Sequence, residues 1–275
     1  MLIMRNLKIL EKICEGPYWE MFRVMEEASG RYFLLKNSKP MGAEKENVPF
    51  IHGYHVEKEF ASDSILRPVE FFDQKEPYSI LYDDPMAVSL ANYMVQKPID
   101  FESFLQITIE LARALALIHQ RKMLHGMIAP CHILVIPKNG KVILTGFEHS
   151  FHFLRDQRIQ EPGIYHSFTL PYTSPEMTGK MNKTVDYRSD LYSLGVVFYE
   201  MATGRNPFKG ENPTDIIFSH LVAEPKDPHL LNPTIPEYIS KIIMKLLKKD
   251  PEERYQNTLG LKADLEQFRN HYYLG

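Results

Sequence analysis

The stretch from residue 171 to residue 208 reads PYTSPEMTGKMNKTVDYRSDLYSLGVVFYEMATGRNPF. Its middle, Leu191 to Met201, is the most apolar part of the chain and predicts a buried helix. Prolines punctuate this stretch, and further helical segments interrupted by prolines follow it. The stretch therefore belongs to a large part of the protein that is mainly helical.

A second long helix is predicted upstream, where apolar residues recur every three or four positions after Asp100. Asp100 is suited to cap this helix, with Glu102 in its first turn. The apolar residues that carry this period are Phe101, Phe104, Leu105, Ile109, Ala112, Leu115 and Ile118. Two short apolar runs follow, Ile133 to Ile136 and Lys141 to Leu144. They flank Lys138-Asn139-Gly140 and predict a hairpin.

The first third of the chain reads as short strands. The runs 32–36 and 78–82 are apolar, and the second one stops at Asp83-Asp84-Pro85. The segment from Glu46 to Phe60 is mixed and accommodates one helix. The sequence therefore predicts an α+β fold in a single domain, residues 1–275, with a small β-rich part over 1–84 and a larger helical part over 85–275.

The composition is that of an ordinary globular protein. Of the 275 residues, 44% are apolar and 24% are charged, and the net charge of -3 gives no basic excess for nucleic acid. The two cysteines, Cys14 and Cys131, are far apart in the sequence and form neither a disulfide framework nor a zinc cluster. Residues 1–10 lack a signal-peptide pattern, and no apolar run approaches the roughly 18 residues that span a bilayer. We therefore expect a cytoplasmic protein that does not associate with nucleic acid or membrane.

The motifs resemble those of protein kinases. Ser174-Pro175-Glu176, followed by the segment from Ser189 to Gly195, is similar to the end of a kinase activation segment and its next helix. The longer stretch 171–208 looks most like the kinase-like domain that opens certain bacterial hybrid sensor histidine kinases. The ordered resemblance runs from Lys36 to Arg254-Tyr255-Gln256. It implies a bilobal protein-kinase-like fold, with an N-lobe over 1–84 and a C-lobe over 85–275, and a bacterial signalling origin.

Several positions that hold a kinase domain together are present. The resemblance implies that Glu176 and Arg254 form a buried ion pair and that Asp190 holds the backbone of the catalytic loop. It implies that His125 opens this loop and that Phe147 is the packing residue of the triplet at 146–148. These residues predict an intact structural framework.

The nucleotide-binding positions are partly kept. The resemblance identifies Lys36 as the strand lysine and Glu57 as its helix partner, with Glu59 as a second candidate; a structural ion pair between the lobes is an equally good interpretation. Tyr82 is a further candidate nucleotide contact. The expected glycine-rich loop is missing, because the segment 15–22 contains a single glycine, and its two glutamates would repel polyphosphate.

The positions that act on metal and substrate are replaced. Met127 stands where the family has the aspartate that faces the substrate hydroxyl, and a thioether cannot accept that proton. His132 offers nitrogen where magnesium prefers oxygen. Gly146 removes the carboxylate that bridges magnesium to the phosphates. Glu148, two residues on, is either a displaced metal ligand or an ordinary solvated acid.

The sequence therefore predicts a pseudokinase, a signalling or binding module with a protein partner. No cofactor is required, and any ATP binding is expected to be weak and independent of metal. Restoring aspartate at 127 and 146 and asparagine at 132 is expected to recover some phosphate transfer. The alternative is an atypical serine/threonine kinase or another ATP-dependent transferase that uses displaced groups, among them Glu148, His149, Asp63 and His132.

Overall fold

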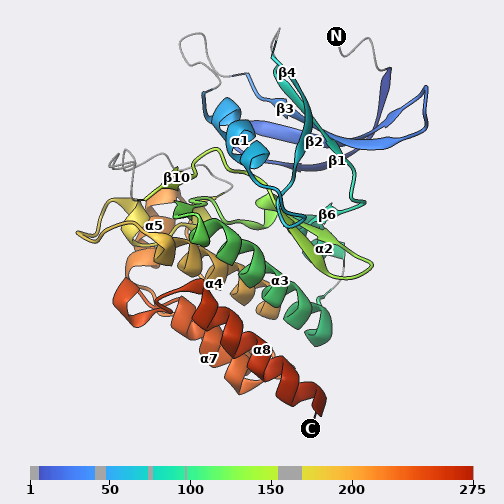
Figure 1. Ribbon diagram of the computed structural model, residues 1–275. Helices are drawn as coiled ribbons and strands as arrows, with labels where there is room; N and C mark the ends of the chain where they lie inside the picture. Colours follow the sequence, from blue (N-terminus) through green and yellow to red (C-terminus); the bar gives the residue numbers. More distant parts are fainter. Residues whose placement is uncertain (1–5, 41–47, 74–76, 97, 154–168, 275) are drawn as a thin grey trace. The chain divides into compact units, whose positions relative to one another are not determined.

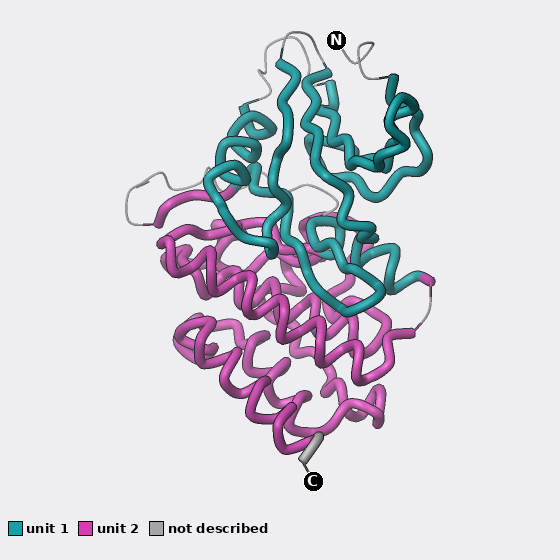
Figure 2. The backbone as a smooth tube through the Cα atoms, turned by 45° about the vertical axis from the view of Figure 1, so that its right-hand side comes forward, with its two compact units in different colours: residues 1–95, 130–149 teal, residues 96–129, 150–275 magenta. Residues whose placement is uncertain are grey.

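The computed structural model describes residues 6–40, 48–73, 77–96, 98–153 and 169–274. The chain divides into two compact units (Figure 2). Unit 1 comprises residues 1–95 and 130–149, and unit 2 comprises residues 96–129 and 150–275. The first unit is built around strands and the second around helices, which confirms the α+β fold class.

Unit 1 contains a five-stranded antiparallel sheet with the order β1-β2-β3-β5-β4. Its strands are β1 (Leu7–Glu15), β2 (Trp19–Glu26), β3 (Tyr32–Ser38), β4 (Pro68–Phe72) and β5 (Ser79–Asp83). The run 32–36 lies in β3, and the run 78–82 lies in β5 apart from Tyr78, which precedes that strand. These two strands pair with each other in the middle of the sheet, where Lys36 stands opposite Ile80.

Helix α1 (Val48–Glu59) lies beside this sheet in Figure 1. It falls within the segment 46–60 for which the sequence predicts a helix; residues 46 and 47 lie outside the described residues. The helix buries Phe50, Val56 and Glu57. A buried glutamate requires a partner, because an unpaired charge away from water is costly.

A second sheet of unit 1 has the order β6-β8-β9. It consists of β6 (Val88–Ser89), β8 (Ile133–Ile136) and β9 (Lys141–Leu144). Helix α2 (Leu90–Gln96) follows β6, and a 3₁₀ helix (Pro130–His132) directly precedes β8. The hairpin β8–β9 matches the predicted one in both bounds. Because β6 pairs with β8, unit 1 runs to Val95 and takes in 130–149, whereas the boundary drawn from the sequence lies between 84 and 85.

Unit 2 is helical. Its helices are α3 (Phe101–Gln120), α4 (Tyr187–Thr203), α5 (Pro213–Val222), α6 (Pro228–Leu231), α7 (Glu237–Leu246) and α8 (Thr258–Leu274). The short strands β7 (Met123–Leu124) and β10 (Phe151–His152) pair with each other, and 3₁₀ helices cover Leu170–Tyr172, Glu176–Thr178 and Pro251–Glu253. Helix α3 packs along α8, as Figure 1 shows.

The helix predicted from periodicity after Asp100 and the buried helix predicted from the apolar stretch 191–201 are both present. Asp100 caps α3 by accepting a hydrogen bond from the backbone N–H of Ser103 at 2.8 Å. The segment 191–201 forms the buried middle of α4, where nearly every side chain is in the core. In the described part of the chain, no helix is long and apolar enough to cross a membrane.

Unit 2 depends on a buried ion pair that the resemblance implied. The Arg254 guanidinium donates to both carboxylate oxygens of Glu176, at 2.7 and 2.8 Å, and neither side chain is exposed. Ser189 donates a further hydrogen bond to Glu176. The remaining Arg254 donors reach backbone carbonyls of Lys248, Arg188 and Lys249. This pair ties the segment after residue 169 to the region before α8.

We expect Glu176→Ala to lower the free energy of unfolding by about 3–5 kcal/mol, because it leaves Arg254 buried without its counter-ion. Burial alone raises the pKa of Glu176, but Arg254 and Ser189 outweigh burial and lower it. The stabilisation is therefore complete above the ordinary carboxyl pKa of about 4.3 and is lost as pH falls through the folded-state pKa. Urea denaturation from pH 7 to pH 3 tests this.

Lys183→Ala is the matched control, because it breaks an ion pair of 2.9 Å with Asp250 in which both side chains are about two-fifths exposed. Exposed pairs contribute little to stability. Equal losses in both variants would contradict the role assigned to Glu176.

Candidate functional site

The candidate site of unit 1 is centred on Lys36, which β3 carries into the interior of the sheet. Its side chain is fully buried. The ammonium nitrogen lies 2.7 Å from Glu148 Oε1 and 3.5 Å from Glu57 Oε1. Burial lowers the pKa of Lys36, but the two carboxylates outweigh burial and raise it above its ordinary value. The lysine is therefore a charged group that is already neutralised by its neighbours.

Glu57, rather than Glu59, is the helix residue that faces Lys36. Glu57 is fully buried, whereas Glu59 lies on the exposed side of α1. Tyr82 and Thr145 donate hydrogen bonds to the Glu57 carboxylate at 2.6 and 2.8 Å. The candidate nucleotide contact Tyr82 thus directs its hydroxyl to Glu57 inside the unit and its side chain is fully buried, because β5 turns this residue inward.

Glu148 is buried, which contradicts its interpretation as a solvated acid. Only 4% of the residue is exposed, and its carboxylate makes the shorter of the two contacts with Lys36. Burial raises the pKa of Glu148, but the charges of Lys36 and His132 outweigh it, so the pKa lies below its ordinary value. Glu148 is therefore an ionised group held in place by Lys36.

Trp19 covers the same lysine from another side. The indole is fully buried, and the Lys36 ammonium lies 4.7 Å from the ring centroid, within the range of a cation–π contact. A Cβ added at Gly16 would lie 2.7 Å from the indole. The single glycine of the β1–β2 turn therefore leaves room for Trp19 to fold under the turn, where a glycine-rich loop would instead approach phosphates.

Gly146 and His132 fit against each other. Gly146 has φ 87°, a conformation that side-chain-bearing residues rarely adopt, and an added Cβ would lie 2.5 Å from the His132 ring. The His132 ring is fully buried and packs against Trp19 at a centroid distance of 5.6 Å. The two residues for which the resemblance implies a replaced metal ligand thus form one packed arrangement.

The loop of unit 2 that the resemblance implies to be the catalytic loop is supported through its backbone. Asp190 accepts hydrogen bonds from the backbone N–H groups of His125 and Gly126, both at 2.9 Å. His119 Nε2 lies 2.9 Å from the same carboxylate. Met127 is 6% exposed and carries no oxygen that could orient a hydroxyl. The loop has its supporting contacts but lacks an acceptor at position 127.

The other groups considered as displaced catalytic residues, His149 and Asp63, have partners of their own. His149 Nε2 lies 2.6 Å from the Tyr18 hydroxyl, and Asp63 is exposed and paired with Lys141 at 3.1 Å. Phe147 is buried and packs near Phe60 at a centroid distance of 5.9 Å. Within the described ranges, no group of three or more His, Cys, Asp or Glu side chains is arranged to hold a metal ion.

The cysteines, distant in the sequence, both belong to unit 1. Burial raises the pKa of the Cys14 thiol, with a smaller contribution in the same direction from the neighbouring Cys131. Both are free thiols. A thiol with a raised pKa is a poor nucleophile, and Cys14 packs, partly buried, against the core of unit 1.

Sequence reasoning missed three features of the site: the cover formed by Trp19, the hydrogen bond from Thr145, and the pairing of Glu148 with Lys36. The lone Gly16 ahead of Trp19 was the available signal for the first. The other two depend on how the segment after β9 returns to α1 and β3, which no local pattern encodes.

We expect Glu148→Gln to destabilise the chain by about 3 kcal/mol at pH 7, the lower end for a broken buried pair, because Glu57 remains beside Lys36. The pKa of Glu148 is lowered, so its stabilisation is present above about pH 4.3 and is lost as pH falls through the folded-state pKa. The gap between variant and parent in chemical denaturation should therefore narrow toward pH 3. Asp73→Asn, at an exposed position of unit 1, is the control; a constant gap would contradict the pairing.

Comparison with protein families matches residues 7–274 to the protein kinase domain. The chain is 48% identical over 101 residues to hybrid signal transduction histidine kinase G of Dictyostelium discoideum, covering 37% of this chain and 3% of that protein. It is 34% identical over 197 residues to histidine protein kinase 1 of Candida albicans, covering 69% and 8%. It is 29% identical over 228 residues to serine/threonine-protein kinase PrkC of Bacillus subtilis, covering 79% and 34%.

The chain spans only a small part of the length of these relatives, so their names describe much larger proteins. The family match, in contrast, covers nearly the whole chain and includes both the strand that carries Lys36 and the region that carries Arg254. On this match, the chain belongs to the protein kinase domain family.

Proposed function

We propose that this chain is a pseudokinase, a kinase-fold signalling or binding module that does not transfer phosphate at a useful rate. The observation that carries the proposal is the fully buried ion pair of 2.7 Å between Lys36 and Glu148. In active kinases the strand lysine contacts the phosphates of ATP. Here its ammonium group is taken by a carboxylate from the segment in which the family has its metal-binding aspartate.

A nucleotide that used Lys36 would have to displace Glu148 and leave that carboxylate without its counter-ion. Breaking a buried pair from one side costs about 3–5 kcal/mol. Each loss of about 1.4 kcal/mol of binding free energy weakens binding tenfold. We therefore infer that ATP binds weakly, that binding is indifferent to magnesium, and that no cofactor is required. Neither Gly146 nor His132 offers the oxygen ligand that magnesium prefers.

The acceptor for the substrate proton is missing as well. Phosphoryl transfer depends on positioning the hydroxyl and neutralising phosphate charge, and Met127 does neither. Removing one oriented electrostatic group commonly reduces a rate by about 10²–10³, and groups that act together lose their effect together. The substitutions at 127, 132 and 146 thus act in the same direction as the occupied lysine.

A kinase fold without phosphate transfer acts through binding and conformation. We propose a protein as its partner, because the net charge of -3 provides no basic excess for nucleic acid. The proposal includes a cytoplasmic location without attachment to a membrane. It also includes a role within a sensor protein of the hybrid histidine kinase type, in keeping with the names of two relatives.

The unmodified chain is expected to phosphorylate neither itself nor a protein substrate when supplied with ATP and magnesium. Restoring Met127→Asp, His132→Asn and Gly146→Asp is expected to recover little, although the sequence alone suggested some recovery. The reason is that Gly146 has φ 87° and that Lys36 is still held by Glu148. Transfer of radioactive phosphate measures the outcome, and robust magnesium-dependent transfer by the parent chain would overturn the proposal.

A second candidate is an atypical serine/threonine kinase or another transferase that uses Glu148 as a displaced metal ligand. One observation favours it: among the described residues, Glu148 Oε2 is buried and has no hydrogen-bond partner. Because the pKa of this carboxyl is lowered, the carboxylate is ionised, and its free oxygen is a ligand of the type that a magnesium ion brought by ATP prefers.

Glu148→Ala separates the two candidates, because one predicts that the substitution increases stabilisation by ATP and the other predicts that it abolishes it. For a pseudokinase the substitution frees Lys36, and ATP should raise the melting temperature of the variant more than that of the parent, with or without magnesium. For a metal-dependent transferase the parent should be stabilised by ATP only with magnesium, and Glu148→Ala should abolish the effect. Thermal unfolding with ATP alone, magnesium alone and both together distinguishes these patterns.

A further inference from the structure

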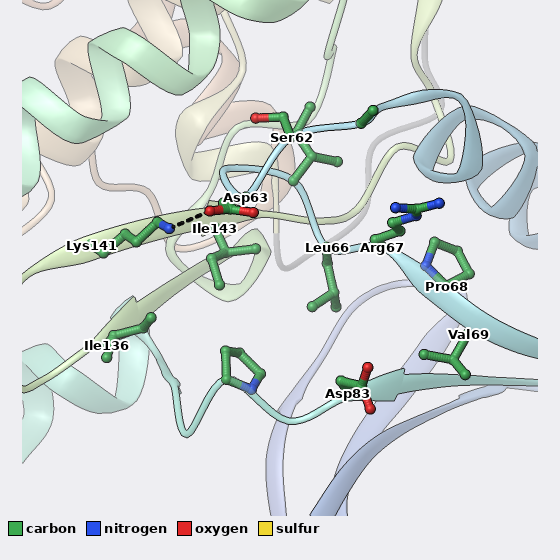
Figure 3. Close-up of a pocket in the computed structure, with 13 residues that line it drawn as sticks. Ser62, Asp63, Leu66, Arg67, Pro68, Val69, Asp83, Ile136, Lys141 and Ile143 are labelled. Atoms are coloured by element: carbon green, nitrogen blue, oxygen red, sulfur yellow. Dashed lines mark hydrogen bonds and ion pairs between the residues drawn. The ribbon is translucent and has the colours of Figure 1, made fainter.

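Unit 1 contains a groove of about 680 Å³ that does not include Lys36 or Glu148. It is formed by the loop between α1 and β4 with the first residues of β4, by the end of β5 and Pro85, and by the hairpin β8–β9 (Figure 3). Its volume lies in the range of ligand sites, which are mostly apolar with a few polar groups that fix orientation.

About half of the groove's lining is apolar. Leu66 and Ile143 are almost completely buried at its base, at 4% and 6% exposure, and Figure 3 shows the Leu66 side chain directed toward its middle. Ile136 is partly buried against the same core. On the β4 side, Val69 is 51% exposed at an irregularity in the pairing of β4 with β5. The groove therefore offers both a buried apolar base and an accessible apolar wall.

The two acidic side chains on the groove's rim have cationic partners, whereas the arginine on the rim does not pair with a described residue. Asp63 is paired with Lys141 at 3.1 Å, and Asp83 is paired with Arg31 at 3.0 Å. Arg67 is exposed, and among the described residues its guanidinium forms no hydrogen bond or ion pair. Since both acids already have cations, the charge left for an occupant is positive, which favours a carboxylate.

Strand β4 adds a feature that favours a peptide over a small molecule. It is the last strand in the order β1-β2-β3-β5-β4, and within the described residues no further strand pairs with it. Its first residues, Pro68 and Val69, line the groove. An unpaired strand edge binds an extended peptide through main-chain hydrogen bonds, while adjacent apolar pockets take alternate side chains.

We propose that this groove binds an extended peptide segment of a partner protein, with apolar side chains on Leu66 and Val69 and an acidic side chain on Arg67. The inference deepens the proposed binding role and rests on it, because it names the chemistry of the partner. The residues that carry it are separate from those that decide phosphate transfer.

A library of random peptides displayed on phage, selected on the full chain, provides the probe. Enriched sequences are expected to combine apolar residues with aspartate or glutamate. The synthetic peptide, measured by fluorescence anisotropy, should bind Arg67→Glu and Val69→Glu at least tenfold more weakly than the parent. Both positions are exposed, so the variants should keep the parent's melting temperature.

Lys8→Glu is the matched control, because it makes the same reversal of charge at an exposed position of β1 that does not line the groove. It should leave peptide binding unchanged. The proposal is wrong if selection enriches no peptide, if Arg67→Glu and Lys8→Glu weaken binding equally, or if octanoate alone binds as tightly as the peptide. The last outcome would indicate a site for a small apolar acid.

These outcomes are independent of the tests of phosphate transfer. Loss of peptide binding with no phosphate transfer would leave the pseudokinase proposal in place and remove only the groove. Peptide binding by a chain that transfers phosphate would keep the groove and remove the pseudokinase proposal.

Discussion

The ion pair between Lys36 and Glu148 is the constraint on which the rest of unit 1 depends. Both groups are fully out of water and 2.7 Å apart, so each requires the other to remain charged. Glu148 follows β9, Lys36 lies on β3, and Glu57 on α1 contacts the same lysine. One cluster of charges therefore joins three segments of the chain that are distant in sequence.

The residues around this ion pair pack against one another in a continuous series of contacts. Gly146 provides a backbone conformation and a space that the His132 ring fills, His132 packs against Trp19, and Trp19 covers Lys36 beneath the turn at Gly16. The family resemblance implies that positions 132 and 146 hold metal in active kinases and that the turn at Gly16 lies over the phosphates there. The packing explains why they are best understood as one alternative core, since changing one of them alone would leave a cavity or a clash.

The supporting contacts of unit 2 follow the pattern that the family resemblance implies, whereas Lys36 of unit 1 has a different set of partners. In unit 2 the pair Glu176–Arg254 and the contacts of Asp190 with the backbone of residues 125 and 126 are formed as the family resemblance implied. In unit 1 the lysine is retained but serves as an internal counter-ion. The proposed binding role needs a stable fold and an accessible surface, and the groove around Leu66 and Arg67 is a surface of unit 1 that does not include Lys36 or Glu148.

The sequence predicted the fold class, the helices after Asp100 and over 191–201, and the hairpin at 133–144, all of which the structure confirms. The replacement of catalytic residues at 127, 132 and 146 stays a prediction. These predictions follow from local patterns: a helical period, a turn pair, and side chains whose chemistry is fixed by their type. It could not determine that Glu148 is buried on Lys36, that Tyr82 supports Glu57, or that Trp19 lies over the lysine. A side chain's exposure and its partners depend on contacts between segments that are distant in sequence, and Lys36 and Glu148 are 112 residues apart. Which of the two carboxylates, Glu57 or Glu148, lies closer to the buried ammonium group of Lys36 follows only from the tertiary structure.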